Sequence, residues 1–149
     1  MSDTRLLSAN PADILMQDHE RIRHLFAEVA RAEDPEIRQR RFRQLRQELR
    51  AHGAIEQEYV YPILKGGVAA IAEDHAALEG LLEKLSEMNV GDKSYDALMK
   101  LLEENFTLHA AVEERDLFPQ LERLSPLSRQ ELTPKLENAR SRRGRSSVG

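Results

Sequence analysis

Hydrophobic residues recur at helical spacing in four long segments of the chain, and short clusters of Gly, Pro, Asn and Asp separate these segments. The first segment begins at Asn10–Pro11, where Asn10 suits the N-cap and Pro11 suits the first helical position. It ends at the "EDPE" of 33–36, where the second segment begins, and "KGG" at 65–67 ends the second. The third runs over 71–85, and "NVGDKS" at 89–94 separates it from the fourth, over 98–119.

This pattern predicts an all-α fold, because no stretch shows the sustained alternation of a strand or the turn signal of a β-hairpin. Four amphipathic helices with short connections favour an antiparallel up-down-up-down four-helix bundle, which we assign to residues 1–124. Residues 125–149 are expected to form a C-terminal extension, with a short helix interrupted by Pro134. The last ten residues, which are basic, are predicted to be disordered.

Composition narrows the class of protein. A chain of 149 residues fits one domain with a sizeable core. The absence of cysteine excludes disulfides, thiolate zinc sites, iron–sulfur clusters and cysteine nucleophiles. A formal charge of −4 predicts no general attraction to nucleic acid or anionic membranes. Neither a signal peptide nor a membrane-spanning stretch is visible, so a cytoplasmic location is the expectation.

An approximate internal repeat places four of the five histidines. In each half of the chain, a single His is followed by His-x-x-x-Glu and then by an aromatic–Pro pair. The equivalent features are His19 and His75, His52/Glu56 and His109/Glu113, and Tyr61–Pro62 and Phe118–Pro119. Residues i and i+4 of a helix lie about 40° apart around the axis and about 6 Å apart along it. A His and a Glu at this spacing can therefore converge on one centre or on two neighbouring centres.

Folded as a bundle, the chain would hold four imidazoles and at least two carboxylates in its interior at similar depth. Burying such groups without partners is costly, and a pair of metal ions would remove that cost. Mixed imidazole and carboxylate ligands suit iron, manganese or zinc better than calcium or magnesium. One His-x-x-x-Glu alone would more often be a surface pair, and one helical His a core residue. The repetition over four helices favours the metal site.

The order His, His-x-x-x-Glu, aromatic–Pro, stated twice, resembles the hemerythrin-like (HHE cation-binding) domain family over residues 12–124. The resemblance implies a non-haem di-iron centre, oxo- or hydroxo-bridged and without an organic cofactor, that binds or reacts with dioxygen and related small molecules. By position, it implies the metal ligands His19, His52, Glu56, His75, His109 and Glu113.

Two further residues bear on the chemistry. Oxygen-carrying hemerythrins place a second histidine four residues after the third-helix histidine, where this chain has Glu79. Glu79 is either a seventh ligand or a surface glutamate. Tyr59 lies three residues after Glu56, where its phenol could hydrogen-bond to a bound oxygen species, ligate ferric iron or be oxidised; packing in the core is the alternative. Asp116 takes the equivalent place in the second half.

Three functions fit these features. The leading hypothesis is a di-iron protein that reacts with dioxygen, hydrogen peroxide or nitric oxide. A carboxylate-rich site favours the ferric state, so a peroxide-consuming oxidoreductase of catalase or peroxidase type is preferred. The second is a module that binds or senses oxygen or iron without turnover, and ligation by Glu79 would count against carriage. The third is a metal-free helical interaction domain with an arginine-rich tail, which leaves the four histidines unexplained. The expected partner is a small diatomic molecule or peroxide, with no membrane or nucleic acid.

Overall fold

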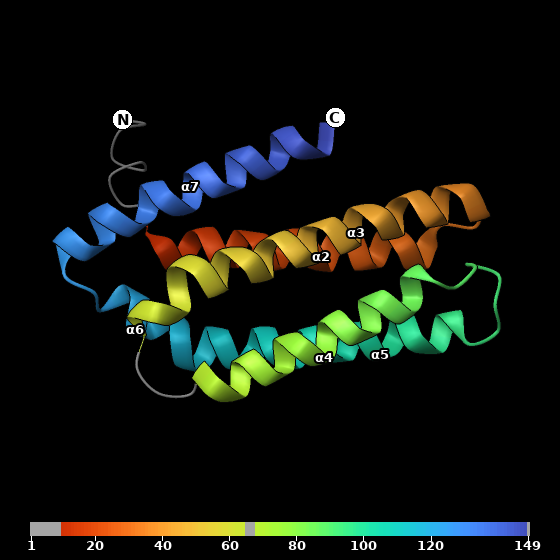
Figure 1. Ribbon diagram of the computed structural model, residues 1–149, viewed down its shortest axis with the longest axis horizontal. Coiled ribbons are helices and arrows are strands. Elements are labelled where there is room, and N and C mark those ends of the chain that lie inside the picture. The colour runs from red at the N-terminus through yellow and green to blue at the C-terminus, as the bar shows by residue number, and fades with distance from the viewer. Residues whose placement is uncertain (1–9, 65–67, 149) are drawn as a thin grey trace.

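The computed structural model describes residues 10–64 and 68–148, with side chains described for 10–64 and 75–142. The described residues contain helices and loops and no strand, as the sequence predicts (Figure 1). The four long helices of the bundle are α2 (Pro11–Arg31), α3 (Pro35–Ile55), α4 (Val68–Ser86) and α5 (Tyr95–Val112). After α3 come the short segments η1 (Glu56–Val60) and η2 (Tyr61–Ile63). After α5 come η3 (Glu113–Leu117) and the short helix α6 (Phe118–Glu122), and the last helix is α7 (Pro126–Val148).

The first two helices begin where capping chemistry predicts. The Asn10 side chain accepts a hydrogen bond from the Asp13 N–H at 3.1 Å, and the Asp34 carboxylate accepts one from the Glu36 N–H at 2.8 Å. A proline follows each cap, at the position where its missing N–H costs nothing. The predicted break at 65–67 lies outside the described residues. The predicted break at 89–94 is the connection between α4 and α5.

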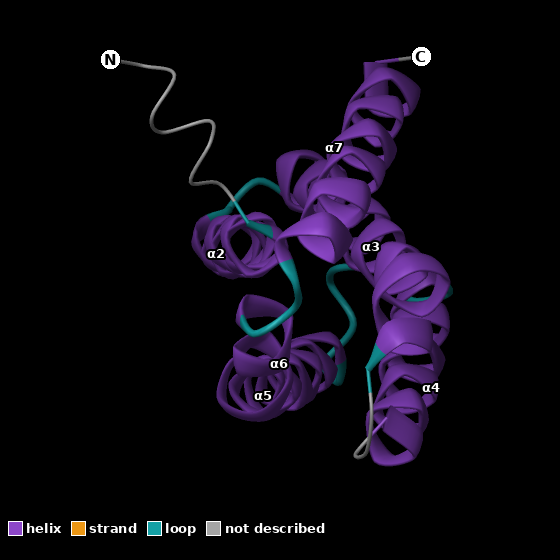
Figure 2. Ribbon diagram, turned by 90° about the vertical axis from the view of Figure 1, so that its left-hand side faces the viewer, coloured by secondary structure: helices purple, strands orange, loops and turns teal. Residues whose placement is uncertain are grey.

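The helices form two antiparallel pairs, α2 with α3 and α4 with α5, and the pairs pack together as a bundle (Figures 1 and 2). Its apolar interior divides into two clusters. One includes Ile22, Leu45, Leu82, Leu102 and Phe106, and the other lies towards α6 and α7. The histidine positions fall between these clusters, so apolar layers close the polar site on both sides.

The C-terminal extension differs from the sequence-based expectation. In place of the predicted short helix, the structure has a helix of 23 residues that runs through Pro134 to Val148, and disorder of the last ten residues stays a prediction. Leu132 and Leu136 are buried on either side of the exposed Pro134 and anchor the helix on the second apolar cluster. This burial offsets the hydrogen bond lost at proline. Within the described residues, no helix combines the length and the apolarity that crossing a bilayer requires.

Candidate metal centre

Six polar residues from the four bundle helices meet between the two apolar clusters. His19 comes from α2, His52 and Glu56 from α3 and its end, His75 from α4, and His109 and Glu113 from α5 and its end. Five of the six are buried, with exposed fractions between 0% and 3%, and the His75 side chain is 9% exposed. The structure thus brings together every residue that the family resemblance marks as a ligand.

The six residues divide into two groups, each able to hold one cation. One group is His19, His52, Glu56 and Glu113, and the other is Glu56, His75, His109 and Glu113. In each group the donor atoms lie within 4.8 Å of one another. Glu56 and Glu113 belong to both groups, which is the arrangement expected of carboxylates that bridge two metal ions.

Unsatisfied polar atoms show that these residues fit metal ions. His52 Nε2 and Glu56 Oε2 are buried without a hydrogen-bond partner among the described residues, although they face each other at 3.2 Å. The Nε2 atoms of His75 and His109 also face each other, at 2.8 Å. Buried polar atoms left unpaired are costly, and imidazole nitrogen with carboxylate oxygen is a donor set that transition metals prefer. The geometry therefore agrees with the donor chemistry.

Two outer carboxylates orient the ligand histidines. Glu114 lies 2.8 Å from His19 Nδ1 and accepts a further hydrogen bond from Arg23. Asp18 lies 3.2 Å from His52 Nδ1. A carboxylate at Nδ1 fixes the proton there and turns the Nε2 lone pair towards a metal.

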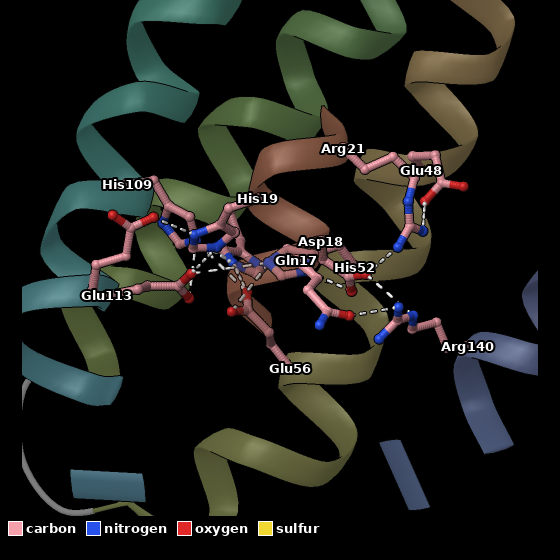
Figure 3. A network of polar contacts seen from close by, with 12 residues as sticks. Gln17, Asp18, His19, Arg21, Glu48, His52, Glu56, His109, Glu113 and Arg140 are labelled. Atoms are coloured by element: carbon pink, nitrogen blue, oxygen red, sulfur yellow. Dashed lines mark hydrogen bonds and ion pairs between the residues drawn. The ribbon is translucent and has the colours of Figure 1, made fainter. Parts of the chain in front are cut away.

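These outer carboxylates were not predicted. The sequence pattern assigned no role to Asp18 or Glu114, although Glu114 faces a histidine of another helix. Asp18 also contacts Arg21 at 3.1 Å, and Figure 3 shows it between His52 and Arg140 of α7. Spacing within one helix carries no signal for such contacts between helices.

Charge in the site favours cation binding. Burial alone would raise the pKa of Glu113, but hydrogen bonds from His109, His19 and His52 hold it well below its usual range. The Glu56 pKa is lowered as well, against burial, chiefly by His52. Burial works to lower the pKa of His109, yet hydrogen bonds to Glu113 and Glu56 raise it to about 9. Burial works to lower the pKa of His52 too, yet the Glu56 charge and a hydrogen bond to Asp18 raise it well above its usual value. Without metal, these shifts favour ionised carboxylates and protons on both His52 and His109.

A wider helical turn follows each His-x-x-x-Glu motif. Glu56–Val60 and Glu113–Leu117 are π-helical, and the N–H groups of Tyr61 and Phe118 donate to the carbonyls of Glu56 and Glu113, five residues back. The proline that follows each aromatic residue cannot donate a hydrogen bond and crowds the preceding turn, which disfavours the regular α-helical pattern in the turn before it.

The π-helical turn brings an unpredicted phenol into the site. The Tyr61 hydroxyl lies 2.8 Å from Glu113, 3.1 Å from Glu56 and 2.8 Å from His75 Nε2. Phe118, its repeat partner, packs on His19 with ring centroids 5.3 Å apart and carries no hydroxyl. The aromatic–Pro repeat was the sequence signal for Tyr61, since both aromatic residues pack on a ligand histidine.

Two sequence-predicted candidates lie elsewhere. The hydroxyl of Tyr59 accepts a hydrogen bond from Arg142 of α7 at 3.3 Å, so the role considered for Tyr59 is corrected in favour of Tyr61. Tyr59 was predicted to face the ligands on the assumption that the α-helix continues without interruption, and the π-helical turn at Glu56–Val60 breaks that regular spacing. Glu79 is 49% exposed and forms an ion pair with Arg50 at 2.7 Å, which makes it the surface glutamate of the two alternatives.

A helical bundle with four inward-facing histidines and two shared carboxylates defines a metal-binding bundle protein. The family model described as the hemerythrin HHE cation binding domain matches residues 10–129. The chain belongs to this family.

Two similar proteins extend the comparison. A crystal structure of a hemerythrin HHE cation binding domain-containing protein from Mycobacterium kansasii superposes with a TM-score of 0.80, covering 94% of this chain and 91% of the other. The two chains are 23% identical, so the likeness shows the shared fold. A DNA nickase from Nostoc sp. is 25% identical over 114 residues, which is 73% of this chain and 32% of the Nostoc protein. The chain thus spans about a third of the length of that relative.

Proposed function

We propose that the protein holds two iron ions in this centre and reacts with hydrogen peroxide, dioxygen or nitric oxide, with peroxide consumption as its main activity. One observation carries the proposal: two groups of two histidines and two glutamates share Glu56 and Glu113. Shared carboxylates bring two cations close together, which suits a reaction that moves two electrons. Imidazole and carboxylate ligands suit iron, the redox-active metal implied by the family.

Peroxide disproportionation balances without an outside reductant, because two hydrogen peroxide molecules give two waters and one dioxygen. Bound iron would supply the change of oxidation state. Tyr61 supplies a hydrogen-bond donor beside it: burial first, and then the charges of Glu56 and Glu113, raise the pKa of the Tyr61 phenol, so it keeps its proton at neutral pH. Its hydroxyl lies among the ligand atoms, where it can donate to an oxygen atom of the peroxide.

Reversible binding of oxygen or iron without turnover is the second candidate. It is favoured by the position of Glu79, which pairs with Arg50 outside the site. Two carboxylates rather than three then face the ions. A third anionic ligand, which would stabilise the ferric state and disfavour reversible oxygen binding, is therefore missing. Reversible oxygenation is the observation that would select this candidate.

Metal analysis and a peroxide assay test the proposal. Chain purified from iron-replete cells should contain about two irons, as the two donor groups require. His52→Ala or Glu113→Ala should lower that content and abolish peroxide consumption. His24→Ala is the matched control, because His24 is 65% exposed and pairs with Glu28 on the surface. A folded chain that binds no metal would overturn the proposal, and iron-loaded chain that oxygenates reversibly without consuming peroxide would select the binding module.

A further inference from the structure

A cavity of about 440 Å³ lies between α3 and α4 and extends to the metal centre. Its inner end is formed by His52, His75 and His109, which are buried or nearly so. Arg50 and Glu79, exposed by 41% and 49%, lie at its mouth. The cavity therefore connects the surface with one side of the site.

Its volume exceeds what peroxide or a diatomic gas needs. A water molecule takes about 30 Å³ of liquid volume, so a molecule of two oxygen atoms takes roughly twice that. An engineered apolar cavity of about 150 Å³ is enough to bind benzene. The cavity between α3 and α4 instead falls within the range of pockets that bind small organic molecules, about 300–1,000 Å³.

The lining defines the chemistry of the occupant. The wall between mouth and inner end is apolar and includes Leu49, Leu78, Leu82 and Phe106. At the mouth, Arg50 and Glu79 neutralise each other in an ion pair at 2.7 Å, so no unbalanced charge there recruits an ion. An uncharged ligand with an apolar body fits this path. Apart from the Arg50–Glu79 pair and the exposed Gln57, the polar lining residues are the three histidines of the inner end, which favours one polar end directed at the imidazoles.

Small residues on both helices keep the cavity open. Gly53 lies where an added Cβ would come within 3.3 Å of His75 Nδ1, so a side chain there would press on the ligand ring. Ala54 of α3 and Ala76 of α4 line the cavity and are exposed. A large side chain at either alanine would fill the space without displacing the buried core.

We propose that this cavity binds an uncharged organic molecule with an apolar body and one oxygen-bearing end, the class of alkyl and aryl hydroperoxides and their alcohols. Turnover of such a hydroperoxide rests on the proposed function, whereas binding does not. The inference names a substrate class larger than hydrogen peroxide for the same centre.

The test uses 2-phenyl-2-propanol, the alcohol of cumene hydroperoxide, with the full-length iron-loaded chain. Binding is measured by equilibrium dialysis. Ala76→Phe should weaken binding at least tenfold by filling the cavity, and Ala54→Leu should weaken it from the other wall. Ala77→Phe is the matched control, since Ala77 is exposed on α4 and does not line the cavity. Iron content and helical circular dichroism verify that each variant is folded.

The outcomes separate this inference from the proposed function. Wild-type chain that does not bind the alcohol, or variants that bind it as well as Ala77→Phe does, would overturn the cavity proposal even if hydrogen peroxide is consumed. Alcohol binding that Ala76→Phe abolishes, without peroxide consumption by the wild type, would support the cavity and refute the peroxide activity. If both hold, cumene hydroperoxide supplied together with hydrogen peroxide should be converted to its alcohol, with hydrogen peroxide as the two-electron reductant (one molecule of each gives alcohol, water and dioxygen). This should occur with wild type and with Ala77→Phe, and more slowly with Ala76→Phe.

Discussion

Replacing Tyr61 by Phe isolates the hydroxyl group that the structure places among the ligands. The ring stays the same, so its packing against His75, with centroids 5.4 Å apart, is retained. What is removed is a donor that lies 2.8 Å from Glu113 and 3.1 Å from Glu56. In metal-free protein both carboxylates are ionised, so they lose a partner that cannot be replaced by water in a buried site.

The magnitude follows from the hydrogen-bonding capacity of a phenol. One hydroxyl carries one proton, so it donates to one carboxylate at a time, although both lie in reach. A hydrogen bond to a charged group contributes about 1.5–3 kcal/mol. Tyr61→Phe should therefore lower the free energy of unfolding of the metal-free chain by about 1.5–3 kcal/mol. For a chain of this size each kcal/mol corresponds to roughly 2–4 °C in Tm, so the expected shift is about 3–12 °C.

Thermal and urea denaturation, followed by circular dichroism, measure this effect with and without metal. Iron-loaded Tyr61→Phe should lose less stability, because cations then compensate the carboxylates. Its peroxide consumption should fall about a hundredfold or more, because the hydrogen bond from the phenol to the reacting peroxide is lost. Tyr59→Phe is the control, since that hydroxyl contacts only Arg142 among the hydrogen bonds found, at 3.3 Å. Equal stability losses for both variants in metal-free protein would refute the reasoning.

Three further perturbations probe the centre and its support. Glu114→Gln weakens the partner that orients His19, so metal affinity should fall about 10–100-fold in a chelator competition, and an unchanged affinity would contradict the orienting role. Because the pKa of His52 is raised well above its usual value and the pKa of His109 is about 9, filling the centre at pH 7 must displace a proton from each. Metal affinity should therefore rise by about tenfold per displaced proton for each pH unit above 7, and a flat profile in metal titrations would contradict this. The raised pKa of His109 stabilises the metal-free chain below pH 6.5, and urea denaturation should show that contribution lost as the pH rises through 9. Leu136→Ala, at a fully buried position of α7, should cost about 2–5 kcal/mol in urea denaturation, whereas Leu127→Ala, 66% exposed, should cost little; equal losses would show that α7 does not depend on its buried face.

Local chemistry explains why much of this protein could be predicted. Helical periodicity and the caps at Asn10 and Asp34 depend on neighbours within a few residues, and they are found where expected. The His-x-x-x-Glu pairs are also local, because i,i+4 spacing fixes two side chains on one helix face. The repeat then indicates which helices share a centre. All-helical architecture and the six converging residues were therefore within reach of the sequence.

Tertiary structure alone decided the surroundings of the centre. Asp18 and Glu114 reach histidines on other helices, and which helices meet at that depth depends on packing rather than spacing. Tyr61 enters the site and Tyr59 does not, because the hydrogen bonds of the π-helical turn join residues five apart. This spacing changes which side chains face inward compared with a regular α-helix. The position of Glu79 also depends on tertiary structure, because Arg50 of a neighbouring helix forms an ion pair with it at the surface. The sequence by itself determined which histidines and glutamates converge in this protein; the packing of its helices decided which residues support that cluster and which lie beside it.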